Sequence, residues 1–157
     1  MKLRLLWAAM IGMIGMGLAT PAAAQNVTAS NPNSIAQVIQ GKGFKTEITK
    51  DEGGDPMIKA EGNGIKFIVL FYGCTANKDC TTITFYAGWS GSQADVNKVN
   101  EWNRGQRFGR AYIDKENDPC IEMDVDLDDG GMSRLLFEDN VEFWMSVMSA
   151  YSKFIYE

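Results

Sequence analysis

The sequence predicts a single α+β domain in which helices pack against one antiparallel sheet. Between residues 44 and 89, short apolar or alternating segments are separated by turns of a few residues, which is typical of neighbouring antiparallel strands. The segments 34–40, 92–105 and 133–156 instead carry apolar residues at helical spacing. A chain of 157 residues has room for one such domain. The predicted order is helix, four strands, helix, two strands, helix.

The two strands at the centre of this pattern are residues 65–72 and 81–89. The first is almost continuously apolar, which predicts a strand covered on both faces. The second alternates, so one face is apolar and the other carries threonine and tyrosine. The connector 75–79 is short and polar, and we therefore expect a hairpin.

Cys74 and Cys80 flank this connector, and a disulfide between them would close the hairpin. The pairing fixes the register, since a slip of one residue would turn the apolar face of the second strand to the wrong side. It sets three pairs of apolar residues opposite one another: Phe71 and Ile83, Val69 and Phe85, and Phe67 and Ala87. The remaining cysteine, Cys120, is expected to be a small buried apolar residue, because Asp118 and Glu122 do not favour a reactive thiolate.

Residues 1–24 have the pattern of a secretory signal peptide. Lys2 and Arg4 precede an apolar run over 5–19, and the segment ends in small residues at Ala24. We expect cleavage after Ala24 and a soluble periplasmic or secreted protein without a membrane span, the alternative being an uncleaved membrane anchor. Disulfides persist in such a compartment. Residues 25–33 are then a flexible lead-in, and 34–157 form the domain.

The first predicted helix, 34–40, has its apolar residues at Ile35, Val38 and Ile39. Residues 44–50 alternate as a strand, and a turn with two glycines leads into the returning strand 57–61. A second tight turn at 62–64 then leads into the central hairpin. The first four strands are therefore expected to form a meander.

A helix over 92–105, with an apolar face through Val96, Val99 and Trp102, is expected to precede a second hairpin. That hairpin joins 107–114 to 120–127 through a three-residue loop at 116–118. The expected register sets these residues opposite one another: Ile113 and Ile121, Ala111 and Met123, Gly109 and Val125, Arg110 and Asp124, Tyr112 and Glu122. The last helix, 133–156, has its expected apolar stripe at Leu135, Leu136, Val141, Trp144, Met145, Met148, Tyr151 and Ile155.

Composition excludes some classes of function. The formal net charge is −5 and the sequence pI is about 4.8, which argues against a nucleic-acid partner. Histidine is absent, and with it the commonest general base and transition-metal ligand. An enzyme built on this chain would depend on carboxylates, lysine, tyrosine or cysteine, and no cofactor is expected.

A series of motifs follows the chain in this order: Gly54-Asp55-Pro56, Asn63-Gly64-x-x-Phe67, Phe71-Tyr72-Gly73-Cys74, Phe85-Tyr86-Ala87-Gly88, Asn100-Glu101-Trp102-Asn103-Arg104, Arg107-Phe108-Gly109-Arg110-Ala111-Tyr112 and Asp118-Pro119-x-x-Glu122-Met123-Asp124. In its order and spacing, this series resembles the YbjN family of bacterial sensory-transduction regulators. The resemblance covers roughly Ile35 to Phe154. It implies a fold like that of type III secretion chaperones, small acidic α+β proteins that bind extended segments of other proteins. It assigns no catalytic residues.

Aromatic residues and one arginine provide the candidate binding surface. We expect peptide contacts from Tyr86, Trp89, Trp102, Phe108, Arg110 and Tyr112. Tyr72 belongs to the same aromatic set, and packing in the core is the default expectation for at least half of its members. Methionines such as Met132, Met145 and Met148 either line an adaptable groove or, more commonly, pack between helix and sheet.

The acidic run Asp124–Asp129 is the alternative candidate site. Alternation sets Asp124, Asp126 and, if the strand continues, Asp128 on one face, where calcium could bind. Together with Glu122, carboxylates on this face could catalyse hydrolysis. The EF-hand pattern is not met, because its sixth position is Asp129 and its twelfth is Leu135. A solvated strand end is the preferred interpretation.

The sequence therefore favours a non-enzymatic, exported binding or regulatory module that recognises a protein or peptide segment, as a monomer or a homodimer. The alternatives are a small carboxylate-based metal-binding protein or hydrolase using Asp124–Asp129, and a structural accessory protein of the cell envelope.

Overall fold

The computed structural model of the chain describes residues 26–62 and 64–157, so the expected signal peptide lies outside the described residues. The fold is α+β, and the element order agrees with the sequence pattern. The elements of the described part are α1 (Pro32–Gly41), β1 (Lys45–Lys50), β2 (Pro56–Gly62), β3 (Ile65–Tyr72), β4 (Thr82–Gly88), α2 (Val96–Gly105), β5 (Arg110–Ile113), β6 (Pro119–Asp126) and α3 (Arg134–Tyr156).

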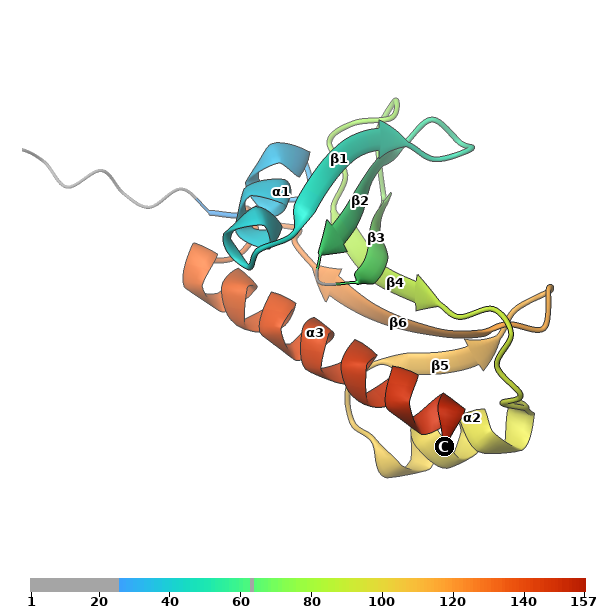
Figure 1. The fold of residues 1–157 in the computed structure, drawn as a ribbon. Coiled ribbons are helices and arrows are strands. Elements are labelled where there is room, and N and C mark those ends of the chain that lie inside the picture. Colours follow the sequence, from blue (N-terminus) through green and yellow to red (C-terminus); the bar gives the residue numbers. More distant parts are fainter. Residues whose placement is uncertain (1–25, 63) are drawn as a thin grey trace, which may run out of the picture.

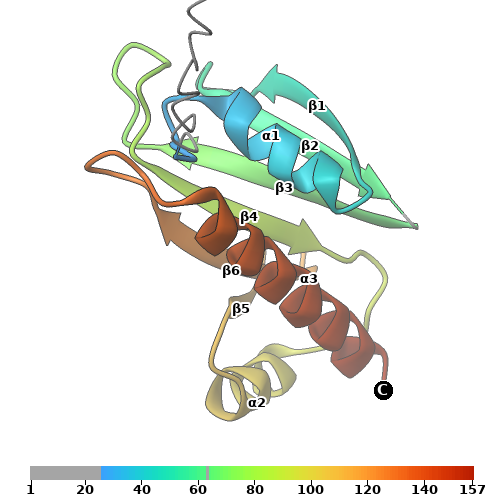
Figure 2. The same cartoon turned by 90° about the vertical axis from the view of Figure 1, so that its left-hand side faces the viewer.

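The strands form one six-stranded sheet in the order β1-β2-β3-β4-β6-β5, and all neighbours within it are antiparallel. The sheet is strongly twisted, so its border strands β1 and β5 run at a large angle to one another (Figure 1). Helices α1 and α3 lie on one face, and α2 lies beside β5 near the C-terminal half of α3 (Figure 2).

The core lies between α3 and the middle of the sheet. The ring of Trp144 on α3 lies 5.9 Å from that of Phe67 and 5.6 Å from that of Phe85 (centroid to centroid). Trp144 and Phe85 are fully buried, and Phe67 is 3% exposed. Aromatic contacts of this kind join β3, β4 and α3 into one packed unit.

The prediction that β3 is covered on both faces is wrong. Phe67, Val69 and Phe71 are buried on the side of the helices, but Ile68 and Leu70 on the other side are only half-buried. No described helix or second sheet covers that other side, so its apolar residues remain accessible to solvent. The apolar run reflects an accessible apolar surface, not a second buried layer.

The first part of α3 also differs from expectation. Ser133 caps the helix by accepting a hydrogen bond from the amide of Leu136. Leu135 and Leu136, which we placed in the apolar stripe, are 79% and 52% exposed. The buried stripe begins instead at Phe137 and continues through Val141 with helical spacing, and the two leucines lie just outside it.

The expected lead-in is partly built into the domain. Val27 pairs with Met132 through two backbone hydrogen bonds of 2.9 and 3.1 Å, and its side chain is 2% exposed. Ala29 is also buried, and α1 begins at Pro32, two residues before the predicted start. The packed domain therefore includes residues before 34.

The central hairpin has the expected register. Val69 lies opposite Phe85 and Phe71 opposite Ile83. Cys74 and Cys80 form the expected disulfide. The disulfide and the alternation of apolar residues both predicted this register, because each sets the same residues of the two strands opposite one another.

The predicted register of the second hairpin is wrong by two residues. Arg110 lies opposite Glu122 instead of Asp124, and Tyr112 opposite Cys120 instead of Glu122. On the buried face, the structure sets Ile113 opposite Pro119 and Ala111 opposite Ile121, whereas the sequence had paired them with Ile121 and Met123. A shift of two keeps every side chain on its expected face but changes all partners.

Asp114 is the cause of this shift. Its carboxylate accepts hydrogen bonds from the amides of Glu116 and Asp118, and its own amide donates to the carbonyl of Asp118. Asn117 takes the left-handed conformation at φ 65°. The loop therefore consists of 115–117, one position earlier than predicted.

One border of the sheet is capped by a side chain. Asn103 of α2 accepts a hydrogen bond from the amide of Ala111 at 3.0 Å and donates one to its carbonyl at 2.9 Å. The amide side chain thus occupies the position of a further strand beside β5. At the other border, β1 has β2 as its only strand neighbour within the described residues.

Candidate binding surface

The face of the sheet turned away from α1 and α3, here called the open face, carries the candidate site. Its side chains follow from strand alternation and register. They are Lys45, Glu47 and Thr49 on β1; Met57, Lys59 and Glu61 on β2; Lys66, Ile68, Leu70 and Tyr72 on β3; Thr82, Thr84 and Tyr86 on β4; Cys120, Glu122, Asp124 and Asp126 on β6; and Arg110 and Tyr112 on β5.

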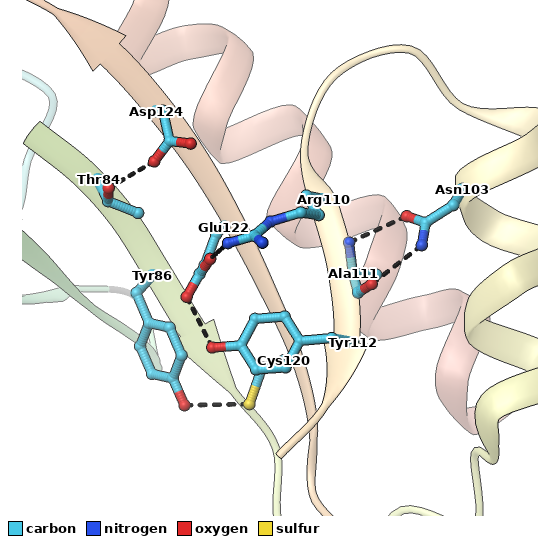
Figure 3. Close-up of polar contacts among 9 residues, drawn as sticks. All are labelled: Thr84, Tyr86, Asn103, Arg110, Ala111, Tyr112, Cys120, Glu122 and Asp124. Carbon is cyan, nitrogen blue, oxygen red and sulfur yellow. Dashed lines mark hydrogen bonds and ion pairs between the residues drawn. The ribbon is translucent and has the colours of Figure 1, made fainter.

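Glu122 is the centre of the polar network on the open face (Figure 3). One oxygen of its carboxylate accepts a hydrogen bond from the Tyr112 hydroxyl at 2.6 Å, and the other forms an ion pair with Arg110. The Glu122 side chain is 13% exposed, whereas that of Arg110 is 71% exposed. The carboxylate is thus largely removed from water but keeps partners on both oxygens, which offsets the cost of its burial.

These contacts shift the pKa values of the two partners. Burial, followed by the hydrogen bond to Glu122, raises the pKa of Tyr112. The hydrogen bond and charge of Glu122 raise the pKa of Arg110 as well. The guanidinium carbon of Arg110 also lies 5.7 Å from the centre of the Tyr112 ring. The three side chains therefore form a charged and hydrogen-bonded unit whose geometry is fixed.

Tyr86 and Cys120 form a second pair beside this unit. The Tyr86 hydroxyl lies 3.0 Å from the Cys120 sulfur, and Cys120 is fully buried. Burial is the main cause that raises the pKa of Cys120 to about 11, and the nearby carboxylate of Asp114 adds to it. The thiol is therefore protonated at neutral pH, in agreement with the prediction of an unreactive buried cysteine.

Two of the hollows on the open face differ in charge. The first has a volume of about 470 Å³ over β1 to β4, and its charged side chains are Lys45, Glu47, Lys59, Glu61 and Lys66. The second has a volume of about 610 Å³ over β3, β4, β6 and β5, and its charged side chains are Arg110, Glu122, Asp124 and Asp126. The half-buried side chains of Ile68 and Leu70 and the exposed ring of Tyr72 lie on β3, which crosses both regions.

The six residues predicted to bind a partner do not form one surface. Tyr86, Arg110 and Tyr112 lie together on the open face (Figure 3). Trp102 is 4% exposed, and its ring lies 5.0 Å from that of Tyr151 in the helix layer. It is therefore a core residue.

The other two predicted residues also lie away from the open face. The half-buried ring of Trp89 lies 5.6 Å from that of Tyr151. Phe108 is 44% exposed, and its ring lies 4.9 Å from that of Phe143 on α3. These aromatic rings support helix packing, in line with the default expectation of packing for at least half of the aromatic set.

Sequence reasoning did not single out Ile68 or Leu70, and it considered Glu122 only for hydrolysis, although all three are prominent on the open face. Ile68 and Leu70 occupy the second face of a run that we interpreted as wholly buried. Glu122 was assigned the wrong partner, because the hairpin register was wrong. The available signal was alternation along β3 and β6, which sets these residues on the same side as Tyr86.

The acidic run supplies part of the second hollow. Asp124 accepts a hydrogen bond from the hydroxyl of Thr84, and Asp126 accepts one from the amide of Asp128 at 3.0 Å. Among residues 26–62 and 64–157, no group of three or more histidine, cysteine or acidic side chains is arranged to hold a metal ion. In the same part of the chain, no helix is both long and apolar enough to cross a membrane.

Comparison with known proteins gives one result. No curated protein and no solved structure has a significant match to this chain. A family model described as "YbjN: Putative bacterial sensory transduction regulator" matches residues 31–157, which include all three helices and all six strands of the described part of the chain. The match agrees with the resemblance found in the sequence motifs, and the chain belongs to the YbjN family.

Proposed function

We propose that this YbjN protein is a non-enzymatic, exported regulator that binds an extended segment of another protein on the open face of its sheet. The observation that carries the proposal is the uneven covering of the sheet. Helices bury one face, whereas the other keeps half-buried Ile68 and Leu70 and the 48% exposed ring of Tyr72 accessible to solvent. Accessible apolar patches of this kind mark interaction sites.

The centre of the open face offers apolar contacts to such a segment. Met57 lies opposite Leu70, and Ile68 lies opposite Tyr86, so apolar and aromatic side chains continue across three strands. Each apolar side chain of a partner that is buried here contributes about 25 cal/mol per Å² of area removed from water. Tyrosine suits such a surface, since its ring is apolar and its hydroxyl can still contact water.

The polar groups around this centre provide orientation. Arg110 keeps most of its guanidinium exposed while Glu122 holds it in place, and a partner carboxylate or carbonyl can therefore bind without reorganising it. Asp124 and Asp126, both exposed, favour basic residues at the other side of the hollow. The proposed partner is thus a segment with apolar residues next to charged ones.

The titration behaviour of the site supports a binding role over a catalytic one. General acid–base catalysis needs a group whose pKa lies near the working pH. On the open face, Tyr86, Tyr112 and Cys120 all have pKa values that are raised further above neutrality, chiefly by burial. These groups hold their protons and act as hydrogen-bonding partners.

Export is the part of the proposal that rests on the leader and the cysteines. Residues 1–24 have the composition of a signal peptide, and the Cys74–Cys80 disulfide is compatible with an oxidising compartment. We therefore place the proposed partner in the periplasm or outside the cell.

Site-specific photo-crosslinking in cells tests the binding face. A photoreactive phenylalanine analogue is introduced in place of Tyr72 on the open face. As the control, it is introduced in place of Leu135 on α3, because Leu135 is 79% exposed. We expect adducts with a defined protein at position 72 and none above background at 135. Equal labelling at both positions, or none at 72, contradicts the proposed face.

A matched pair of variants then tests the apolar contact. Ile68→Asp adds a charge at the centre of the open face, and Leu135→Asp adds one to exposed α3. We expect Ile68→Asp to reduce the adduct formed at position 72 by at least about 10-fold, since burying an unpaired charge is costly. Leu135→Asp is expected to leave it unchanged. Thermal melting of both variants verifies that each remains folded.

A further inference from the structure

The two borders of the sheet are treated differently by the rest of the chain. At β5, Asn103 satisfies both backbone groups of Ala111 that point away from the sheet. At β1, no described side chain or backbone group forms a hydrogen bond with the outward-facing backbone of residues 45–50. An uncovered strand edge is a template for pairing with another strand.

The ladder between β1 and β2 identifies which backbone groups point outward. The amide of Asp51 donates to the carbonyl of Asp55 at 2.9 Å, and Lys50 lies opposite Pro56, which has no amide hydrogen. Hydrogen-bonded and non-hydrogen-bonded pairs alternate in an antiparallel ladder. The N–H and C=O groups of Thr46, Ile48 and Lys50 therefore point away from β2.

We propose that β1 pairs in antiparallel fashion with β1 of a second copy of this chain, so that two six-stranded sheets form one continuous sheet. The two-fold axis passes through Ile48, which then lies opposite Ile48 of the second copy. The backbone groups of Thr46 face those of Lys50 across the new border. This arrangement forms about six hydrogen bonds between the two copies, two for each hydrogen-bonded pair of residues.

Charge selects this register from its neighbours. With the axis at Ile48, Lys45 lies opposite Asp51 of the other copy, which is attractive. An axis at Glu47 or at Lys50 sets that residue against itself, and an axis at Thr49 sets Glu47 against Asp51. Like charges directly opposite one another destabilise a strand pair.

One other register, with the axis at Thr46, also sets opposite charges against each other, but the paired segment would be too short. An axis at Thr46 sets Lys45 against Glu47, but it keeps only residues 45–47 of each strand in the pair. The axis at Ile48 pairs residues 46–50, almost the whole strand. It also brings together two Ile48 side chains, each 43% exposed in the single chain.

The composition of helix α1 also favours a second copy of this chain as the partner. None of the residues of Pro32–Gly41 is charged, although charged residues make up 22% of the chain. Its exposed amide side chains, Asn33, Gln37 and Gln40, form one stripe at helical spacing, and Gln40 donates a hydrogen bond to Thr46 at 2.7 Å. The stripe therefore lies on the β1 side of the helix, towards the uncovered border.

In the proposed dimer, this stripe meets its own copy across the two-fold axis. Helix α1 lies over β1 and β2, so it is about one strand spacing away from the two-fold axis. The α1 helices of the two copies are therefore about 10 Å apart, which is the usual distance between packed helices. Amide side chains both donate and accept hydrogen bonds, and an uncharged stripe can therefore pair with itself without repulsion.

Sedimentation equilibrium tests the dimer. The protein is expressed as the whole chain and purified from the cell fraction in which it accumulates. We expect a dimer that Ile48→Lys weakens, with a dissociation constant raised by at least about 100-fold, because two charges would face each other at the axis. Leu135→Lys, at an exposed residue on α3, is the control and should leave association unchanged. A wild-type monomer up to millimolar concentration, or a dimer that Ile48→Lys does not affect, overturns the proposal.

A mixture of two variants, each with one added cysteine, tests the register. Glu47 lies opposite Thr49 of the other copy in a non-hydrogen-bonded pair, where side chains approach most closely. Glu47→Cys mixed with Thr49→Cys should give a crosslinked dimer under oxidising conditions, whereas either variant alone should give little. Crosslinking by Glu47→Cys alone would instead set the axis at Glu47 and overturn the register. Wild-type protein controls for Cys120, which is buried.

If a segment other than a second copy of this chain pairs with β1, these experiments give different results. A strand from another protein would leave the pure protein monomeric. Pairing with residues of its own leader would give a monomer in which the mixture of Glu47→Cys and Thr49→Cys does not crosslink. Both outcomes contradict the dimer. The proposed binding of a partner on the open face is measured separately at Tyr72, so either proposal can fail alone.

Discussion

The carboxylate of Glu122 accepts a hydrogen bond from the hydroxyl of Tyr112 at 2.6 Å, across two adjacent strands at the β5 border of the sheet. Glu122 also lines the hollow that Arg110 and Asp124 line. Because Glu122 is mostly buried and Arg110 is mostly exposed, the carboxylate supports the surface from below, and the guanidinium is presented to solvent.

Glu122→Ala should therefore reduce the free energy of unfolding by about 1–2 kcal/mol, since it leaves the half-buried Tyr112 hydroxyl without its acceptor. Glu61→Ala is the matched control on the same face. Its ion pair with Lys66 is exposed on both sides, and its loss should cost less than about 0.5 kcal/mol. Urea unfolding of both variants measures the difference, and equal losses would show that Glu122 has no structural role.

Stability should fall at alkaline pH, and Cys120 should account for the first part of the fall. Its pKa is raised to about 11 by burial, whereas an unfolded cysteine has a pKa of about 8.5. The folded protein thus binds the proton more tightly, so this contribution is complete below about pH 8.5 and is lost as the pH rises towards 11. Burial also raises the pKa of Tyr151, to about 12, and its contribution is lost at higher pH than that of Cys120.

Urea unfolding of the wild type and of Cys120→Ala between pH 7 and 11 measures this effect. The variant lacks the titrating thiol, so the stability difference between the two proteins should narrow above about pH 9. A difference that stays constant over the whole range would mean that Cys120 is not the responsible group.

The parts of the fold that the sequence predicted correctly are those fixed by two independent signals. In the β3–β4 hairpin, the alternation of residues and the positions of Cys74 and Cys80 select the same register. In the β5–β6 hairpin, alternation alone is compatible with any even shift. The choice depends on hydrogen bonds from Asp114 within the loop, which periodicity does not reveal.

The candidate site was predicted in part for the same reason. Tyr86, Arg110 and Tyr112 lie on the strands where alternation placed them, and these three lie together. Trp102 was assigned both to the apolar face of its helix and to the binding surface, and its buried ring, which packs against Tyr151, agrees only with the first assignment. The accessible side of β3 was missed because a continuous apolar run is compatible with one or two covered faces.

Asn103 should be important for stability although its side chain is on the surface. Asn103→Ala removes both hydrogen bonds to Ala111 and exposes the β5 border, and we expect a loss of about 1–3 kcal/mol. Asn103→Asp keeps the acceptor but loses the donor to the Ala111 carbonyl, so it should also destabilise. Asn100→Ala on the same helix is the control, because Asn100 is exposed and its substitution should change stability by less than about 0.5 kcal/mol. Thermal melting of the three variants gives the comparison, and a harmless Asn103→Ala would contradict the capping role.

The loop between β3 and β4 contains an unfavourable backbone conformation that a single substitution should relieve. Ala76 has φ 51°, in the left-handed region that residues with a Cβ atom rarely adopt, and it is exposed. Ala76→Gly should therefore raise the free energy of unfolding by about 0.5–1 kcal/mol. The gain is limited by the greater freedom of glycine in the unfolded chain, although the Cys74–Cys80 disulfide restrains that freedom. Ala76→Val should have the opposite sign, because a β-branched residue is disfavoured further at positive φ. Urea unfolding of the two variants with the disulfide intact tests the pair, and destabilisation by glycine would show that the conformation of Ala76 carries no cost.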